Sequence, residues 1–424
     1  MVKKKVNKPQ REVTKRQLSR WQRQKRKQRI LLGSGILIIL AVLGIISVGI
    51  YQRWYIAEYK PLHETVITVN DTEFNMDYYI NMLKYYGQGM SIQQIYGLAD
   101  EVVIYIEQNE LIKQGALNQL GISVSNQEVD NELKNRDLPL SRDYRDVVRT
   151  QMLIDKLLNE HFGPEVPPSD EQRHIMAMFL ESEKQASETI TKLENDEEFT
   201  DLAKELSLDS FSEENEGDLG WRPEGVLTML LDSSLPDEYA FTSELGVLSQ
   251  PIYDETKTKN IGYWIINVLE REEESEQAHI QVILLSSEEQ AQMVRTRLED
   301  GDDFATLAQD FSQLEGVEDN EGDLSWVTPG TMSSTIDEFV FNTELELSQP
   351  LRDEDVWTEG GYWLVKVINI DDDRELEQED RDLLKAKALN EWVLALWDNP
   401  ENEIDDSYLD YMKKEWAIWK ALEG

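Results

Sequence analysis

The chain has 424 residues, a formal net charge of −42 and no cysteine. The lack of cysteine excludes disulfides, thiol catalysis and thiolate metal sites, and the excess of acid argues against nucleic acid as a partner because phosphates would be repelled. The length predicts two to four domains.

The N-terminal region has the pattern of a signal anchor. Residues 1–29 carry 13 Lys and Arg and one acid, whereas residues 30–52 carry no charge. A spanning helix needs about 20 apolar residues, and the basic flank predicts a cytoplasmic N-terminus. Tyr51, Trp54 and Tyr55 suit a membrane–water interface. A cleaved signal peptide is the alternative, but its apolar core is shorter, about 7–15 residues. We expect a single-pass cell-membrane protein that contacts lipid through one helix and holds its body outside the cytoplasm.

Residues 53–166 predict a mainly helical domain. A strand-like start at 66–71 precedes apolar residues at helical spacing in 99–120. Ser125 and Glu128 form a capping-box pattern that opens the next helix. Gly-Pro and Pro-Pro pairs then break the helical pattern and place a domain boundary there.

The following two hundred residues contain an internal repeat. EGDLGW recurs 105 residues later as EGDLSW, and LSQP and GYW each recur 99 residues later. Each copy has β-rich ends with helices between them, which predicts two compact α/β units. We place these units at 167–271 and 272–372.

Residues 373–424 return to helical spacing and are rich in aromatic side chains. We expect this C-terminal segment to pack on the 53–166 domain, because neither piece alone promises a large core. The predicted fold class is α+β. It has one N-terminal transmembrane helix, a helical domain from both ends of the soluble chain, and two inserted α/β units.

Five motifs recur in the same order in both units: His-Ile, Phe-x-x-Leu-Ala, Gly-Asp-Leu, Ser-Gln-Pro and Gly-Tyr. They begin at His174, Phe199, Gly217, Ser249 and Gly262 in the first unit, and at His279, Phe304, Gly322, Ser348 and Gly361 in the second. As an ordered set, these motifs resemble the parvulin type of peptidyl-prolyl cis–trans isomerase.

The flanking stretches 68–71, 114–122, 125–129 and 389–392 resemble the helical chaperone region of the SurA and PpiD type of envelope foldase. This resemblance implies a chaperone module whose clients are unfolded or exported polypeptides containing X-Pro bonds. The translocation machinery is a further candidate partner. No cofactor and no metal are implied.

The parvulin resemblance implies a site made of two histidines, an Asp or Cys, and a Met/Phe pocket. The catalytic candidates are His174 and His279, one in each unit, and Asp209, whose position holds Leu314 in the second unit. The substrate-pocket candidates are Leu227, Met229, Phe241 and Trp264 in the first unit and Met332, Ile336, Phe341 and Trp363 in the second. The two tryptophans stand where the family has its second histidine. A hydrogen-bonded core histidine and a loop-capping aspartate are the alternative interpretations of His174 and Asp209.

Isomerisation of a prolyl bond asks for an apolar slot and a polar network that tolerates the twisted amide. Three functions remain open. The first is a membrane-anchored prolyl isomerase and foldase, which the family resemblance favours. The second is a holdase chaperone with non-catalytic parvulin units, which the missing histidine favours. The third is an envelope scaffold organised around the translocation machinery.

Overall fold

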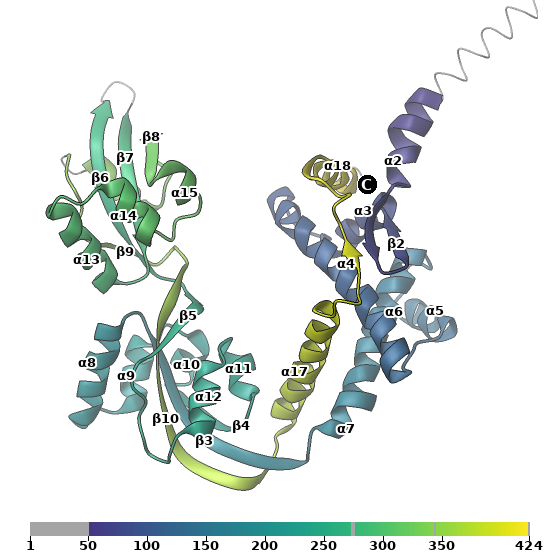
Figure 1. Cartoon of the computed structure of the whole chain (residues 1–424), viewed down its shortest axis with the longest axis horizontal. Helices are drawn as coiled ribbons and strands as arrows, with labels where there is room; N and C mark the ends of the chain where they lie inside the picture. The colour runs from purple at the N-terminus through teal and green to yellow at the C-terminus, as the bar shows by residue number, and fades with distance from the viewer. Residues whose placement is uncertain (1–50, 273–275, 343–344, 423–424) are drawn as a thin grey trace, which may run out of the picture. The chain divides into compact units, whose positions relative to one another are not determined.

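The structure, a computed structural model, describes residues 51–272, 276–342 and 345–422. They form two compact units, shown in Figure 1: a helical unit, up to Ile154 and from Val393 onward, and a sheet unit, Asp155–Trp392. The predicted basic tail and nearly all of the predicted transmembrane helix lie outside the described residues. Within the described ranges, no helix is long and apolar enough to cross a membrane.

The helical unit combines a three-stranded sheet, ordered β11-β1-β2, with long helices. Its elements are η1 (Tyr51–Tyr59), α2 (Lys60–Leu62), β1 (Thr65–Val69), β2 (Thr72–Asn75), α3 (Met76–Tyr86), α4 (Ile92–Leu120), α5 (Asn126–Asn135), α6 (Arg142–Lys156), β11 (Ile404–Asp405) and α18 (Tyr411–Leu422). Ser125 and Glu128 form a capping box at the start of α5, which confirms that prediction. Gly121, at a φ of 69°, ends α4 in the left-handed conformation that glycine adopts readily.

The two ends of the described chain meet in this unit. Strand β11 pairs antiparallel with β1, so that Val69 lies opposite Ile404. The Asn70 side-chain amide donates to Asn402 Oδ1 at 3.0 Å, and α18 packs on α3 and α4. Ala417 and Ile418 of α18 are buried in this contact. The C-terminal segment therefore completes the core of the N-terminal helices.

The sheet unit carries two four-stranded antiparallel sheets flanked by helices. Its elements are η2 (Leu157–Phe162), α7 (Gly163–Glu165), β3 (Ser169–Leu180), α8 (Glu183–Glu194), α9 (Phe199–Leu206), α10 (Ser210–Glu214), β4 (Asp218–Pro223), α11 (Val226–Leu231), α12 (Leu235–Thr242), β5 (Ile252–Lys259), β6 (Gly262–Glu272), β7 (Gln277–Leu285), α13 (Glu288–Glu299), α14 (Phe304–Phe311), α15 (Val317–Asn320), β8 (Asp323–Val327), α16 (Ser334–Asn342), β9 (Leu351–Asp353), β10 (Thr358–Glu375) and α17 (Gln378–Trp397), which continues into the helical unit. The α+β class, with helical regions flanking two α/β domains, is confirmed.

The two sheets exchange their last strands. The first sheet has the order β4-β3-β10-β5 and the second the order β8-β7-β6-β9. Strand β6 follows β5 in the chain but pairs with β7, whereas β10 returns to pair with β3. The units expected at 167–271 and 272–372 therefore do not each form a sheet of their own. The second sheet, made of β6 to β9, is inserted between β5 and β10 of the first.

This exchange has a physical reason, because β6 and β10 are copies of one repeat motif and present the same contacts. The Val365 N–H donates to Ser249 Oγ at 2.9 Å, and the Ile266 N–H donates to Ser348 Oγ at 2.8 Å. Each strand also contains a glycine, Gly262 in β6 and Gly361 in β10, that has no room for a side chain. A Cβ on Gly361 would collide with the Phe179 ring. The motif identifies a closing strand but not the sheet that it closes.

Candidate functional site

His174 lies on the opposite face of the first sheet from the expected site. Ile175, Ala177 and Phe179 pack into the core that contains Trp363 and the α11 and α12 residues. Because side chains alternate along a strand, His174 faces the other side, the side to which Met178 also points. There His174 Nε2 lies 2.6 Å from Asp218 Oδ1. His174 and Asp209 thus have different partners, no hydrogen bond or ion pair joins them among the described residues, and a shared site stays a prediction.

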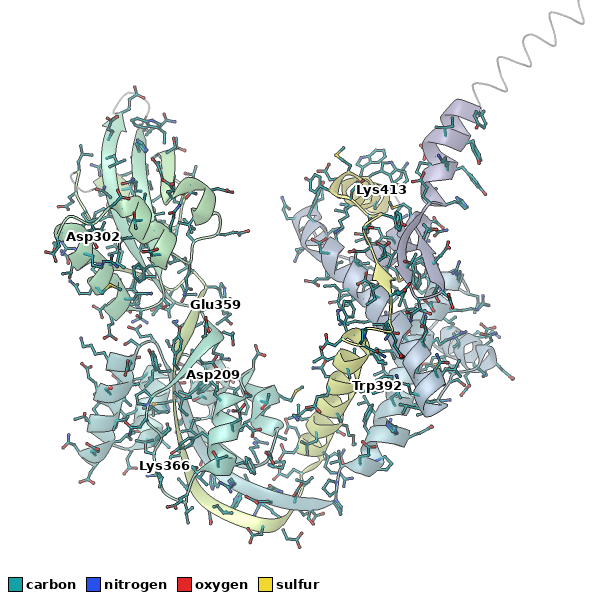
Figure 2. The ribbon with its side chains drawn as sticks, viewed as in Figure 1. Asp209, Asp302, Glu359, Lys366, Trp392 and Lys413 are labelled. Atoms are coloured by element: carbon teal, nitrogen blue, oxygen red, sulfur yellow. The ribbon has the colours of Figure 1, made fainter. Side chains whose placement is uncertain are left out.

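Asp209 caps a helix and forms a buried ion pair. Its Oδ1 accepts from the Ser212 N–H at 2.8 Å at the start of α10, and its Oδ2 lies 2.9 Å from Lys257 Nζ. The Lys257 ammonium also lies 5.9 Å from the centroid of the Trp363 ring. Figure 2 labels Asp209 within this domain. Its charge is already compensated, so the contacts support the capping interpretation of this residue.

Trp363 stands at the centre of the first core, fully buried. Its Nε1 donates to Asp254 Oδ2 at 3.0 Å, and Ser233 Oγ donates to the same oxygen at 2.5 Å. Burial acts to raise the pKa of Asp254, but the hydrogen bonds from Ser233, Trp363 and two backbone N–H groups outweigh it and lower the pKa. The carboxylate is therefore held charged under the indole.

The second sheet repeats this arrangement with the other tryptophan. Trp264 Nε1 donates to Asp353 Oδ2 at 2.9 Å, and Ser333 Oγ donates to it at 2.8 Å. The sequence assigned Trp264 to the first unit and Trp363 to the second. The strand exchange places each in the other domain, which corrects both assignments.

His279 also lies away from its expected pocket. Ile280 and Val282 pack with Trp264 in a core that Met332, Ile336, Phe341 and Leu314 complete. His279, next to Ile280 on β7, faces the opposite side of the sheet, where its Nε2 lies 2.8 Å from Asp323 Oδ1. The pocket residues predicted for the second unit thus come together without Trp363 and without a histidine.

The pocket residues predicted for the first unit separate into three environments. Leu227 is buried in the core with Trp363, whereas Met229 is exposed. Phe241 packs at the edge of this core and lines a surface groove of about 570 Å³. The groove is lined by Leu235, Tyr239, Phe241, Thr242 and Ile252 and by the carboxylates of Glu171, Glu224 and Glu238.

Sequence reasoning found Phe241 but missed the rest of this groove. Leu235 and Tyr239 are four residues apart on α12, so their spacing could have placed them on one helix face. The extra residues before α12 hid this signal. In the part of the chain that the structure describes, no group of His, Asp or Glu side chains is arranged so that it could hold a metal ion.

Comparison with known families defines the class of both domains. Residues 174–270 and residues 263–371 each match a profile described as the PPIC-type PPIase domain. The chain therefore carries two parvulin-type peptidyl-prolyl isomerase domains. The two matches overlap inside β6, the strand that leaves the first sheet for the second.

Among individual proteins, the chain is similar to bacterial foldases. It is 33% identical over 162 residues to the foldase protein PrsA of Caldanaerobacter subterraneus, covering 34% of this chain and 48% of that protein. It is 28% identical over 285 residues to the chaperone SurA of Saccharophagus degradans, covering 63% of this chain and 58% of that protein. The chain thus spans about half the length of these relatives. A crystal structure of PrsA from Bacillus anthracis aligns with 76% of this chain and 95% of that one, with 13% identity and a TM-score of 0.30.

Proposed function

We propose that this chain is a membrane-anchored foldase that acts outside the cytoplasm on unfolded, exported polypeptides. The basic tail and the 23-residue uncharged run support the anchor. The foldase and chaperone relatives support unfolded polypeptides as the clients. The observation that carries client binding is the groove along α12 in the first parvulin-type domain.

The chemistry of this groove matches an extended polypeptide. Its floor of Leu235, Tyr239 and Ile252 offers apolar surface, and its size of about 570 Å³ is within the range of ligand pockets. The carboxylates of Glu224 and Glu238 line the same groove. Their field favours segments in which Lys or Arg stands beside an apolar residue.

Prolyl isomerisation is the second candidate, and the two PPIC-type domains favour it. The catalytic contribution expected of histidine has no support in the geometry, since both His174 and His279 face away from the tryptophan-filled cores. Any turnover must then depend on apolar surface that accepts the twisted prolyl bond. Client binding is accordingly the function that the geometry supports best.

The test compares client protection with prolyl isomerisation in one set of variants. Glu238→Lys reverses a groove charge and is expected to weaken protection of a basic, unfolded client several-fold in an aggregation assay. Glu205→Lys makes the same charge change on the exposed face of α9, outside the groove, and is expected to protect like the parent chain.

In a protease-coupled assay on a proline tetrapeptide, His174→Ala and His279→Ala are expected to leave the rate unchanged. A parent chain that protects no client would contradict the binding function. A prolyl-isomerase rate that disappears in His174→Ala would contradict the placement of this residue outside the site.

A further inference from the structure

Aromatic rings form an exposed stripe where the described chain begins. Tyr51, Tyr55, Tyr59 and His63 stack at every fourth residue, with ring centroids 5.2, 5.6 and 4.0 Å apart in turn. This spacing places the four rings on one face of η1 and α2. All three tyrosines are exposed, and Tyr51 is 55% exposed. A continuous exposed aromatic surface of this kind marks an interaction site.

The C-terminal helix lies along the same segment. Lys420 Nζ is 3.1 Å from Glu58 Oε2, and Lys413 Nζ is 3.7 Å from Glu64 Oε2. Residue numbers rise along 58–64 while they fall along α18, so the two segments run antiparallel. The last turn of α18 therefore points back toward Tyr51.

This last turn adds exposed apolar side chains at the level of the tyrosine stripe. Trp419 is 55% exposed and Leu422 is 43% exposed. The Lys420 ammonium lies 4.9 Å from the centroid of the Trp419 ring. Tyr and Trp combine an apolar body with a polar tip and concentrate at membrane–water interfaces, where lysine extends its ammonium toward water.

We propose that these side chains form an aromatic collar that rests in the phospholipid headgroup layer on the non-cytoplasmic side. The collar consists of Tyr51, Tyr55, Tyr59, Trp419 and Leu422. The proposal rests on the membrane anchoring proposed above and extends it. The collar would tie the helical unit to the bilayer through both ends of the chain.

The chain itself indicates lipid as the occupant of this surface. The uncharged run ends at Gln52, inside the stripe that Tyr51 begins. Glu58, which pairs with α18, lies six residues further on, within two helical turns of Gln52. The headgroup layer is about 5–7 Å thick on each side, so Tyr51 and Tyr55 fall within it and Tyr59 lies on its aqueous side. The rings of η1 thus extend from the end of the uncharged run across the headgroup layer.

The charges around the collar indicate which lipid it needs. Glu58 and Glu64 each pair with a lysine of α18, and Lys60 Nζ lies 3.8 Å from the same Glu64, so these groups together carry one net positive charge. Binding is therefore expected to rest mainly on interfacial burial of the rings, with a small added attraction to anionic headgroups. Replacing part of the phosphatidylcholine by phosphatidylglycerol should strengthen it slightly.

The experiment uses the absence of cysteine in the native chain. Full-length Leu422→Cys, labelled with a polarity-sensitive fluorophore, is reconstituted into phosphatidylcholine vesicles with and without headgroup-nitroxide lipid. Leu117→Cys, at a leucine 57% exposed on α4, is the matched control. The label at 422 is expected to be quenched at least threefold more than the label at 117, with or without phosphatidylglycerol.

Flotation of the same vesicles separates the two proposals. Protein that floats with equal quenching at 422 and 117 would overturn the collar and leave the anchor intact. Protein that does not float would overturn the anchor, and the collar with it. A further outcome concerns an unfolded polypeptide added outside the vesicles. If it abolishes quenching at 422 and has no effect at 117, the surface binds clients and the lipid assignment is overturned.

Discussion

At the scale of single residues, Glu107 is a buried carboxyl group whose environment disfavours its charged form. It is 4% exposed within α4, and its Oε1 atom has no hydrogen-bond donor among the described residues. Burial, with a contribution from Asp406, raises the pKa of Glu107 to about 7 against the opposing effect of Lys414. The folded chain thus holds this proton more tightly than the unfolded chain, whose pKa is near 4.5. Stability from this group is present below pH 4.5 and is lost as the pH rises through 7.

Replacing this carboxyl group by an amide should remove that pH dependence. Glu107→Gln is expected to raise the free energy of unfolding by up to about 3 kcal/mol at pH 8, because the shift is worth about 1.4 kcal/mol per pKa unit. At pH 4.5 the same variant should match the parent chain. Thermal unfolding from pH 4.5 to 8.5 measures both effects. Glu101→Gln, at an exposed position of the same helix, is the control, and parallel curves for Glu107→Gln and the parent would contradict the argument.

The structure groups the predicted site residues where packing decides and separates them where one strand position decides. Met332, Ile336 and Phe341 were predicted as one apolar pocket, and they share one core. His174 and His279 were placed on strands, but a shift of one position moves a side chain to the other face of a sheet. A repeat motif gives the order of residues along a strand and not the face that each one takes.

At the scale of elements, the exchange of β6 and β10 is the main feature that the sequence concealed. Helix starts such as Ser125 are local signals, and they were predicted from neighbours within four residues. Strand pairing joins residues far apart, as with Gln172 and Asp371, which lie opposite each other in β3 and β10 although 199 residues separate them in the sequence. Two strands with one motif leave this long-range choice undetermined.

Paired cysteines can test the exchange directly. Met176 of β3 lies opposite Lys366 of β10, and both line a groove of about 290 Å³. Opposed residues of antiparallel strands are about 4.5–5.5 Å apart at Cα, which suits a disulfide. Met176→Cys with Lys366→Cys is therefore expected to cross-link on oxidation, seen as a mobility shift that a reductant reverses.

The matched control places the second cysteine on the other copy of the strand. Asn267 of β6 occupies the repeat position of Lys366, 99 residues earlier. Met176→Cys with Asn267→Cys is expected to remain reduced, because β6 pairs with β7. Cross-linking of this pair in place of the first would restore a tandem arrangement of the two domains.

At the scale of the whole molecule, the helical unit depends on both ends of the chain. Strand β11 extends the β1–β2 sheet, and α18 buries Ala417 and Ile418 against the N-terminal helices. Each fully buried aliphatic side chain contributes roughly 1.5–3 kcal/mol. The pieces are separated in sequence by the complete pair of parvulin-type domains.

A truncation should therefore affect the two units differently. Deleting residues 400–424 is expected to abolish cooperative unfolding of the helical unit while the sheet unit keeps its transition. Differential scanning calorimetry with far-ultraviolet circular dichroism measures this. Tyr411→Ser, at an exposed position of α18, is the control for a change without loss of core. A truncated chain that keeps both transitions would contradict the dependence.

The exchanged strands also set a problem of timing. A chain is made from its N-terminus, so β3, β4 and β5 exist before either closing strand. Strand β6 then appears first and offers β3 the repeat-motif contacts that β10 will later provide. Its competitor is β7, which follows after a short connection and so pairs at a lower entropic cost. Early formation of the β6–β7 hairpin would prevent β6 from pairing with β3. The edge of β3 would then stay unpaired until β10 is synthesised.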